Sequence, residues 1–199
     1  MRNRSALVVM AKAPQGENVK TRLRGLMPDH ERLALYASLL EGTVERLADV
    51  PDVDTYISFT PESARGYFLS FGLPVFPQEG VDLGHRMHVA LKTVLANGYE
   101  SAALVGSDIP ELTAGTVTGG LALLRESDVV FGPARDGGYY LVALKKPAGE
   151  VFKGIRWSTP HALEDSVRRA EGLGLRVALA EELYDIDTIE DVMAYRGPR

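Results

Sequence analysis

The chain has 199 residues, of which 45% are hydrophobic and 25% are charged. This length suits a single domain with a sizeable core, although two small domains would also fit. The 22 Lys and Arg residues against 27 Asp and Glu residues give a net charge of -5, so the chain lacks the overall positive charge typical of nucleic-acid-binding proteins. Cysteine is absent, which excludes disulfides, thiolate metal sites and cysteine nucleophiles.

No apolar run reaches the length of a transmembrane helix. The apolar segment at residues 6–11 is also too short for the core of a signal peptide, and it favours a buried strand instead. We therefore expect a cytoplasmic protein with no membrane span and no nucleic-acid partner. The sequence does not indicate an oligomeric state.

Strands alternate with helices along the chain. Strands are predicted at residues 7–10, 53–59, 74–76, 102–105, 129–131, 139–144 and 175–178. Helices are predicted at residues 33–47, 63–71, 83–94 and 114–125, after Thr159-Pro160, and from Thr188 onward. This alternation predicts an α/β fold with a mostly parallel sheet and helices on both faces.

Two short patterns refine this prediction. Thr60-Pro61 is typical of an N-cap followed by a first-turn proline, which starts the helix at residues 63–71. Asp136-Gly137-Gly138 is typical of a hairpin turn between the strands at residues 129–131 and 139–144. The hairpin adds a strand of opposite direction, so we expect a mixed sheet.

The loop after the first strand, residues 12–24, holds four cations and one anion. Ligands of open α/β sheets bind beyond the carboxyl ends of the strands, where this loop lies. Lys12, Lys20 and Arg22 are suited to phosphate groups, and the alternative is a solvated basic loop. The loop is no P-loop, because Val19 stands where that motif has glycine before the Lys20-Thr21 pair.

Gly106-Ser107-Asp108-Ile109-Pro110 follows the strand at residues 102–105 directly. An acid at the carboxyl end of a buried strand can hold a hard cation that bridges phosphate oxygens. The alternative is a turn in which Asp108 accepts hydrogen bonds from nearby amides. The position at a strand end favours the functional interpretation of Asp108.

Two further acidic segments have structural explanations from spacing alone. Asp136 belongs to the predicted hairpin turn. Asp187 and Glu190 have the spacing of a capping box for the last helix. Asp185 and Asp187 alternate, so in an extended segment both side chains would face one side and reach a metal. Spacing alone favours the turn and the cap.

Two weaker features involve side chains that bind metals or bases. His85 and His88 lie three residues apart on a predicted helix, but no third ligand is evident nearby, which favours a solvated helix face. The amide of Gln78 is suited to contact a nucleotide base, although ordinary loop surface explains it equally well.

Taken together, these segments resemble a bacterial glycosyltransferase-like family described as rSAM/selenodomain-associated or as arsenosugar-biosynthesis glycosyltransferases. The resemblance spans nearly the whole chain in ordered blocks. The blocks are Met10-Ala11-Lys12-Ala13-Pro14 with Val19-Lys20-Thr21-Arg22-Leu23, Leu83-Gly84-His85-Arg86-Met87, Gly106-Ser107-Asp108-Ile109-Pro110, Gly132-Pro133-Ala134-Arg135-Asp136-Gly137-Gly138-Tyr139-Tyr140-Leu141, Gly154-Ile155-Arg156-Trp157-Ser158-Thr159 and Asp185-Ile186-Asp187-Thr188.

The resemblance implies a Rossmann-like GT-A fold, the nucleotide-diphosphosugar transferase fold, as one domain over residues 1–199. It implies Asp108 as the metal-binding acid, joined by Asp187 in the manner of related nucleotidyltransferases, with Asp185 as the alternative partner. Lys20 and Arg22 would face the nucleotide phosphates and assist catalysis. The remaining expected site residues are Asp136 as base or orienting group for the acceptor, and Lys12, Gln78 and Ser107 as nucleotide contacts.

This chain departs from the family pattern at two positions. The family usually has glycine where Glu17 stands, and a common proline is replaced by Ile189. The first departure affects how the loop would contact phosphate groups. The second is expected to have very little effect.

We therefore expect a transferase that uses a divalent metal, magnesium or manganese, a nucleotide-activated sugar donor and a small-molecule acceptor. One alternative is a nucleotidyltransferase that resembles phospholactate or molybdenum-cofactor guanylyltransferases and releases pyrophosphate. The other is a non-catalytic nucleotide-sugar-binding protein. The base, the sugar, the acceptor and the stereochemistry of transfer are left open.

Overall fold

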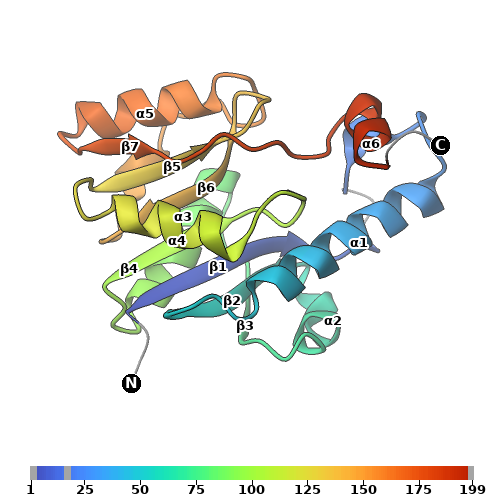
Figure 1. Ribbon diagram of the computed structural model, residues 1–199, viewed down its shortest axis with the longest axis horizontal. Coiled ribbons are helices and arrows are strands. Elements are labelled where there is room, and N and C mark those ends of the chain that lie inside the picture. The colour runs from blue at the N-terminus through green and yellow to red at the C-terminus, as the bar shows by residue number, and fades with distance from the viewer. Residues whose placement is uncertain (1–3, 16–18, 197–199) are drawn as a thin grey trace.

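The computed structural model describes residues 4–15 and 19–196. Within these residues, seven strands form one sheet in the order β3-β2-β1-β4-β6-β5-β7 (Figure 1). All pairings are parallel except those of β6, which runs antiparallel to both β4 and β5. The strands are β1 Ser5–Lys12, β2 Val53–Thr60, β3 Val75–Pro77, β4 Ser101–Val105, β5 Val129–Pro133, β6 Tyr139–Leu144 and β7 Val177–Leu179.

Helices cover both faces of this sheet (Figure 1). The α-helices are α1 Asp29–Leu47, α2 Arg65–Leu69, α3 Leu83–Leu95, α4 Ala114–Leu123, α5 Ala162–Gly172 and α6 Ile189–Arg196. Single 3-10 turns lie at η1 Thr21–Leu23, η2 Glu62–Ala64 and η3 Gly149–Phe152. The predicted α/β fold with a mostly parallel mixed sheet is therefore confirmed.

The side chains of β1 show how the core divides between the two faces. Leu7 and Val9 belong to a hydrophobic cluster that includes residues of α1 and α4, whereas Ala6 and Val8 belong to a second cluster that includes residues of α3 and α5. All four are fully buried, because successive side chains of a strand point to opposite faces and helices cover both. This explains why the strand is apolar throughout.

The predicted N-cap at Thr60 is wrong. Thr60 is the last residue of β2, where it pairs with Lys12, and its carbonyl accepts a hydrogen bond of 2.8 Å from the amide of Ala13. Pro61 is extended and precedes η2, so the expected single helix is a 3-10 turn followed by the short α2. Continuation of the β1–β2 ladder to Thr60 therefore outweighs the local capping signal.

The position of β1 creates a crevice at the carboxyl edge of the sheet. Its neighbours are β2 on one side and β4 on the other, so the loops that leave β1 and β4 are directed apart. Such a switch point is where open α/β sheets bind ligands. Because β6 runs in the opposite direction, its start lies beside the end of β4, where the amide of Gly106 donates to the carbonyl of Tyr140 at 3.1 Å. The hairpin turn before β6 therefore lies at this same edge.

Gly137 fixes this hairpin turn against the chain that leads to α5. Its φ is +85°, and a Cβ added to it would lie 2.2 Å from the carbonyl oxygen of Pro160. The carbonyl of Gly137 also accepts a hydrogen bond of 3.0 Å from the amide of Leu163. These two contacts fix the distance between the hairpin turn and the segment that leads to α5.

We expect Gly137→Ala to lower the free energy of unfolding by about 3 kcal/mol, because a left-handed backbone and a steric clash add together. Gly174→Ala is the matched control. Gly174 has a φ of +75° with nothing within 4 Å of the added Cβ, so it should lose only about 1–2 kcal/mol through the backbone. Urea unfolding of both variants measures the difference, and equal losses would contradict a clash at Pro160.

Candidate active site

A cleft of about 690 Å³ lies at the carboxyl edge of the sheet. It is lined by the loops after β1 and β4, the hairpin turn before β6, and the segment between β7 and α6. The structure brings every site residue expected from the sequence into this one cleft. They are Lys12, Lys20, Arg22, Gln78, Ser107, Asp108, Asp136, Asp185 and Asp187.

Lys20 joins two of the expected acids. Its Nζ lies 2.6 Å from Oδ2 of Asp108 and 2.9 Å from Oδ1 of Asp187, and its side chain is buried. Burial by itself lowers the pKa of Lys20, but the two carboxylates outweigh burial and hold this pKa above its usual value. Lys20 is therefore a charged ammonium group between Asp108 and Asp187, rather than part of a solvated loop.

Arg22 extends this ion-pair network. Its Nη1 donates to Oδ2 of Asp187 at 3.0 Å and lies 3.7 Å from Oδ2 of Asp136. Leu23, the next residue, is fully buried in a small cluster with Ile186 and Val192. This apolar contact holds the loop after β1 against the chain before α6, and thereby brings residues more than 160 positions apart into contact.

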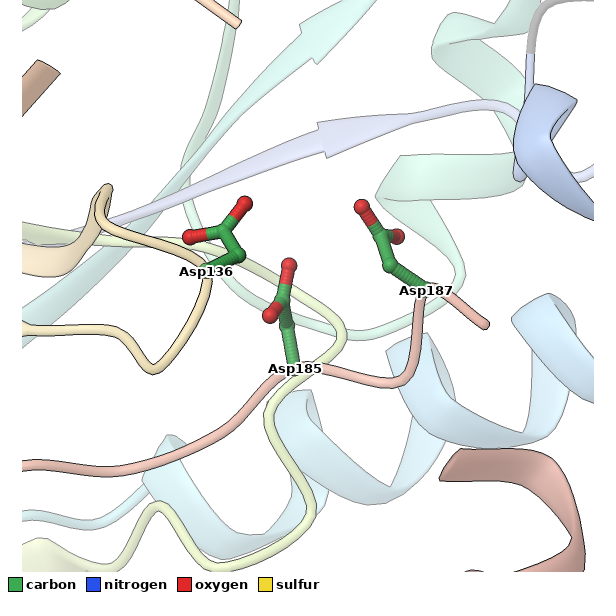
Figure 2. A group of neighbouring side chains, drawn as sticks. All are labelled: Asp136, Asp185 and Asp187. Atoms are coloured by element: carbon green, nitrogen blue, oxygen red, sulfur yellow. The ribbon is translucent and has the colours of Figure 1, made fainter. Parts of the chain in front are cut away.

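Three acids converge beside these cations. Figure 2 shows the carboxylates of Asp136, Asp185 and Asp187 directed toward one another, and one oxygen of each lies within 4.8 Å of the others. Burial, followed by the charges of Asp187, Asp108 and Asp136, raises the pKa of Asp185 to about 7. A bound cation would offset the negative charge of the neighbouring carboxylates, which adds to burial in raising this pKa.

The donor set of this cluster fits a hard divalent cation, since carboxylate oxygens are the ligands that Mg²⁺ and Mn²⁺ prefer. Asp108, which the resemblance implied as the main metal ligand, contacts Lys20 and is not in the three-acid group. The structure therefore draws Asp185 and Asp187 together as candidate ligands, and the role of Asp108 stays a prediction.

The predicted capping box is displaced by one residue. The amide and hydroxyl of Thr188 both donate to Oδ2 of Asp191 at 2.8 Å, and the amide of Asp191 donates back to the hydroxyl of Thr188. Asp187 and Glu190 were expected in these roles. Thr188 is a favourable N-cap residue, and its use leaves the carboxylate of Asp187 to bind Lys20 and Arg22.

We expect Asp191→Ala to lower the free energy of unfolding by about 1 kcal/mol, the usual effect of losing a helix cap. Glu190→Ala is the matched control from the same turn, and it should change stability by less than about 0.5 kcal/mol. Thermal unfolding should separate the two by about 1–4 °C. A larger effect for Glu190→Ala would contradict this assignment of the cap.

Asp136 combines the turn role expected from its spacing with a place in the cleft. Its Oδ1 accepts a hydrogen bond of 2.9 Å from the amide of Gly138, which is the local bond of an Asx turn. Its Oδ2 faces Arg22 at 3.7 Å, and its side chain is 37% exposed. The same residue thus shapes the turn and presents a carboxylate to the cleft.

Tyr36 is a residue of this site that sequence reasoning missed. Its hydroxyl lies 3.0 Å from Oγ of Ser107 and accepts a hydrogen bond of 3.0 Å from the amide of Lys12. Burial, helped by Asp108, raises the pKa of Tyr36 to about 12. Tyr36 therefore ties the loop after β1 to the loop after β4. A tyrosine on the apolar face of the helix was the available signal, since its polar tip needs a partner when buried.

Gln78 lines the cleft and also holds the end of β3 in place. Its Nε2 donates to the carbonyls of Ala11 and Ser58, at 2.9 and 3.0 Å. Contact of Gln78 with a base stays a prediction. His85 and His88 do not line the cleft. His85 is exposed, as expected for a solvated helix face, but this expectation is wrong for His88, whose ring is half-buried with its Nδ1 enclosed. Glu17, where the chain departs from the family pattern, lies outside the described residues.

Comparison with known proteins places the chain in a family. The family model described as "Uncharacterized protein conserved in bacteria (DUF2064)" matches residues 43–159. The chain belongs to the DUF2064 family. None of the helices in the described part of the chain has the length and apolar character needed to span a bilayer.

One solved structure is similar over nearly the whole chain. It is a putative nucleotide-diphospho-sugar transferase from Desulfovibrio desulfuricans G20, with 30% identity, a TM-score of 0.88, and coverage of 95% of this chain and 84% of that one. The expected nucleotide-diphosphosugar transferase fold is thus confirmed.

Two curated relatives are guanylyltransferases. A phosphoenolpyruvate guanylyltransferase of Sphaerobacter thermophilus is 27% identical over 89% of this chain and 86% of its own length. A 2-phospho-L-lactate guanylyltransferase of Methanothermobacter thermautotrophicus is 28% identical over 88% and 77%. These names confirm the expected class of enzyme, a transferase. The arsenosugar and rSAM association stays a prediction.

Proposed function

We propose that this DUF2064 protein is a metal-dependent transferase that uses a nucleoside-diphosphate sugar as donor and a hydroxyl compound as acceptor. The observation that carries the proposal is the contact of Lys20 and Arg22 with Asp108, Asp136 and Asp187 in a cleft at the switch point of the sheet. A site for phosphate together with a hard cation needs both signs of charge in one place. We take residues 1–199 as one domain with this activity.

The donor would lie on the loops after β1, β3 and β4. Lys12, Lys20 and Arg22 line that part of the cleft and would bind the diphosphate, with Arg22 able to offer two parallel hydrogen bonds. Gly106 and Ser107 line the cleft, and because their side chains are absent or small, the donor could approach the backbone there. Gln78, anchored to β1 and β2, would contact the base.

Asp185 and Asp187 would hold the divalent cation. When bound, the ion would offset the negative charge that develops on the leaving diphosphate. Asp108, which the resemblance implies as a further metal ligand, would also keep Lys20 charged and oriented, because it lies 2.6 Å from the ammonium group. Asp136, on the hairpin turn, would orient the acceptor hydroxyl and take its proton.

In the proposed reaction, the sugar passes from the nucleoside diphosphate to a hydroxyl group of the acceptor. The acceptor oxygen forms a bond to the anomeric carbon of the sugar while the bond from that carbon to the diphosphate oxygen breaks. The electron pair of that bond leaves with the nucleoside diphosphate, and the hydroxyl proton passes to the carboxylate of Asp136.

A guanylyltransferase activity is the second candidate, and the names of the two curated relatives favour it. In that case an acceptor phosphate oxygen would attack the α-phosphorus of a nucleoside triphosphate, and pyrophosphate would leave. The same cations and acids would serve a triphosphate, so the products separate the two activities.

The test is a product assay with purified protein, Mg²⁺ or Mn²⁺, and a panel of nucleoside-diphosphate sugars and nucleoside triphosphates. Release of a nucleoside diphosphate is the expected result, and pyrophosphate would establish the second candidate instead. Binding that survives Asp136→Asn, without turnover of any donor, would identify a binding protein. Absence of both binding and turnover would overturn the proposal.

A further inference from the structure

Helix α1 contacts both ends of the loop after β1 through two buried polar side chains. Arg32 and Tyr36 lie four residues apart, so they share one face of the helix, and both are buried. The hydroxyl of Tyr36 accepts a hydrogen bond of 3.0 Å from the amide of Lys12. The guanidinium of Arg32 donates to the carbonyl of Val19. The loop that carries Lys20 is therefore held at its start and near its end by α1.

The hydroxyl of Tyr36 also lies 3.0 Å from Oγ of Ser107, and the available protons decide the direction of this hydrogen bond. In the described part of the chain, the partners of the Tyr36 hydroxyl are the amide of Lys12 and Oγ of Ser107. The amide can only donate, so Oγ of Ser107 is left as the acceptor of the Tyr36 proton. The reverse direction would leave this proton buried without a partner, which is costly.

Ser107 therefore keeps its own proton to donate. Burial is the main cause that raises the pKa of Tyr36 to about 12, so Tyr36 holds its proton near neutral pH. Ser107 lines the cleft, and among residues 4–15 and 19–196 its hydroxyl has Tyr36 as its one hydrogen-bond partner. The proton of Ser107 is thus available to an acceptor atom that enters the cleft.

The chemistry at Ser107 suits a phosphate oxygen. Ser107 precedes Asp108, whose carboxylate lies 2.6 Å from Nζ of Lys20, so its hydroxyl belongs to the part of the cleft given above to the phosphates of the donor. A charged phosphate oxygen accepts hydrogen bonds, and a hydroxyl group that donates to it forms a charge-assisted bond. A hydroxyl group that is oriented before binding also loses little entropy on binding.

We infer that Tyr36 is a positioning residue, which holds the hydroxyl of Ser107 so that it donates a hydrogen bond to a phosphate oxygen of the nucleotide substrate. Ser107 makes the contact with the phosphate, and Tyr36 acts through Ser107. The inference rests on the proposed function for the place of the phosphates. It applies equally to the diphosphate of a nucleotide sugar and to the triphosphate of the second candidate activity.

The test is isothermal titration calorimetry with Mg²⁺ and one of three probes: inorganic pyrophosphate, UDP or GDP. Ser107→Ala should weaken the binding of all three about tenfold or more, because a hydrogen bond to a charged group is lost. Tyr36→Phe should weaken binding about threefold to tenfold, because the hydroxyl of Ser107 is no longer held. The double variant should bind within about twofold of Ser107→Ala, because the two residues act as one unit.

Tyr99→Phe is the matched control. Tyr99 is a buried tyrosine just before β4, at the opposite edge of the sheet, and its hydroxyl donates to Asp54 at 2.6 Å. This variant should lose stability in thermal unfolding as Tyr36→Phe does, but its binding of the probes should change less than about twofold. A loss of binding in Tyr99→Phe as large as that in Tyr36→Phe would overturn the positioning role.

The remaining outcomes are also decisive. Additive losses in the double variant would show that Tyr36 does not act through Ser107 and would overturn the inference. Unchanged binding in Ser107→Ala, or a loss seen with UDP and GDP but not with pyrophosphate, would overturn it even if Tyr36→Phe does not fold. Absence of any binding by the wild type would overturn the inference together with the proposed function. The expected losses without turnover of any donor would contradict the proposed function alone.

Discussion

Replacing Lys20 by methionine is expected to reduce turnover by at least ~100-fold, the scale seen when one preorganised charge-stabilising group is lost. The same change should lower the free energy of unfolding by about 3 kcal/mol, because it leaves Asp108 and Asp187 without the ammonium group that lies between them. That loss corresponds to a decrease of about 6–12 °C in the unfolding temperature.

Lys146→Met is the control, since Lys146 is exposed and follows β6 at the opposite edge of the sheet. It should leave turnover and unfolding temperature nearly unchanged. The double variant Lys20→Met with Asp108→Asn should recover part of the stability by removing one unpaired charge, but none of the turnover. An unchanged unfolding temperature for Lys20→Met would show that the ion pairs contribute nothing to stability.

Asp185 is expected to make the metal-free protein less stable as the pH rises from about 4 to about 7. Its pKa is raised from 3.8 to about 7 in the folded chain. The folded state therefore holds a proton that the unfolded state has lost, and stability falls over this range. Asp185→Asn should remove this slope and stabilise the metal-free protein at pH 8 by roughly 1–2 kcal/mol, a value reduced for partial exposure of the group.

A bound divalent metal should offset this loss of stability at high pH. Mg²⁺ or Mn²⁺ should raise the unfolding temperature of the wild type more at pH 8 than at pH 5, since a ligand carboxylate binds in its charged form. Asp185→Asn should lose this response together with at least ~100-fold in turnover. Asp128→Asn, at an exposed ion pair with Arg176, should keep the response. An equal metal response in Asp185→Asn and wild type would rule out Asp185 as a ligand.

The sequence predicted those features of the fold and site that short patterns determine. The apolar run of β1 implied a strand covered on both faces, and Asp136-Gly137-Gly138 implied the hairpin that makes the sheet mixed. The rule that ligands bind beyond strand ends brought Lys20 and Asp108 into consideration. Spacing alone predicted a turn role for Asp136 and a capping role for Asp187, and only the family resemblance implied that both belong to the site.

Features set by tertiary contacts were missed. Thr60 has the pattern of an N-cap, but pairing along β1 takes it into a strand. Asp187 has the spacing of a capping residue, but Thr188 takes that role one position later. Tyr36 and Trp157 line the cleft, but no motif marks them as site residues. The hydroxyl of Tyr36 is hydrogen-bonded to Ser107, and the indole of Trp157 is positioned by its packing on Gly84.

The reversed direction of β6 brings a later part of the chain to the cleft. Most of the lining residues from position 134 onward come from one continuous stretch, residues 134–162, which starts at the hairpin turn. This stretch includes β6, most of whose residues are buried between β4 and β5. The shape of the cleft on this side is therefore coupled to the packing of the sheet, and a substitution in the core of β6 should alter the cleft as well as the stability.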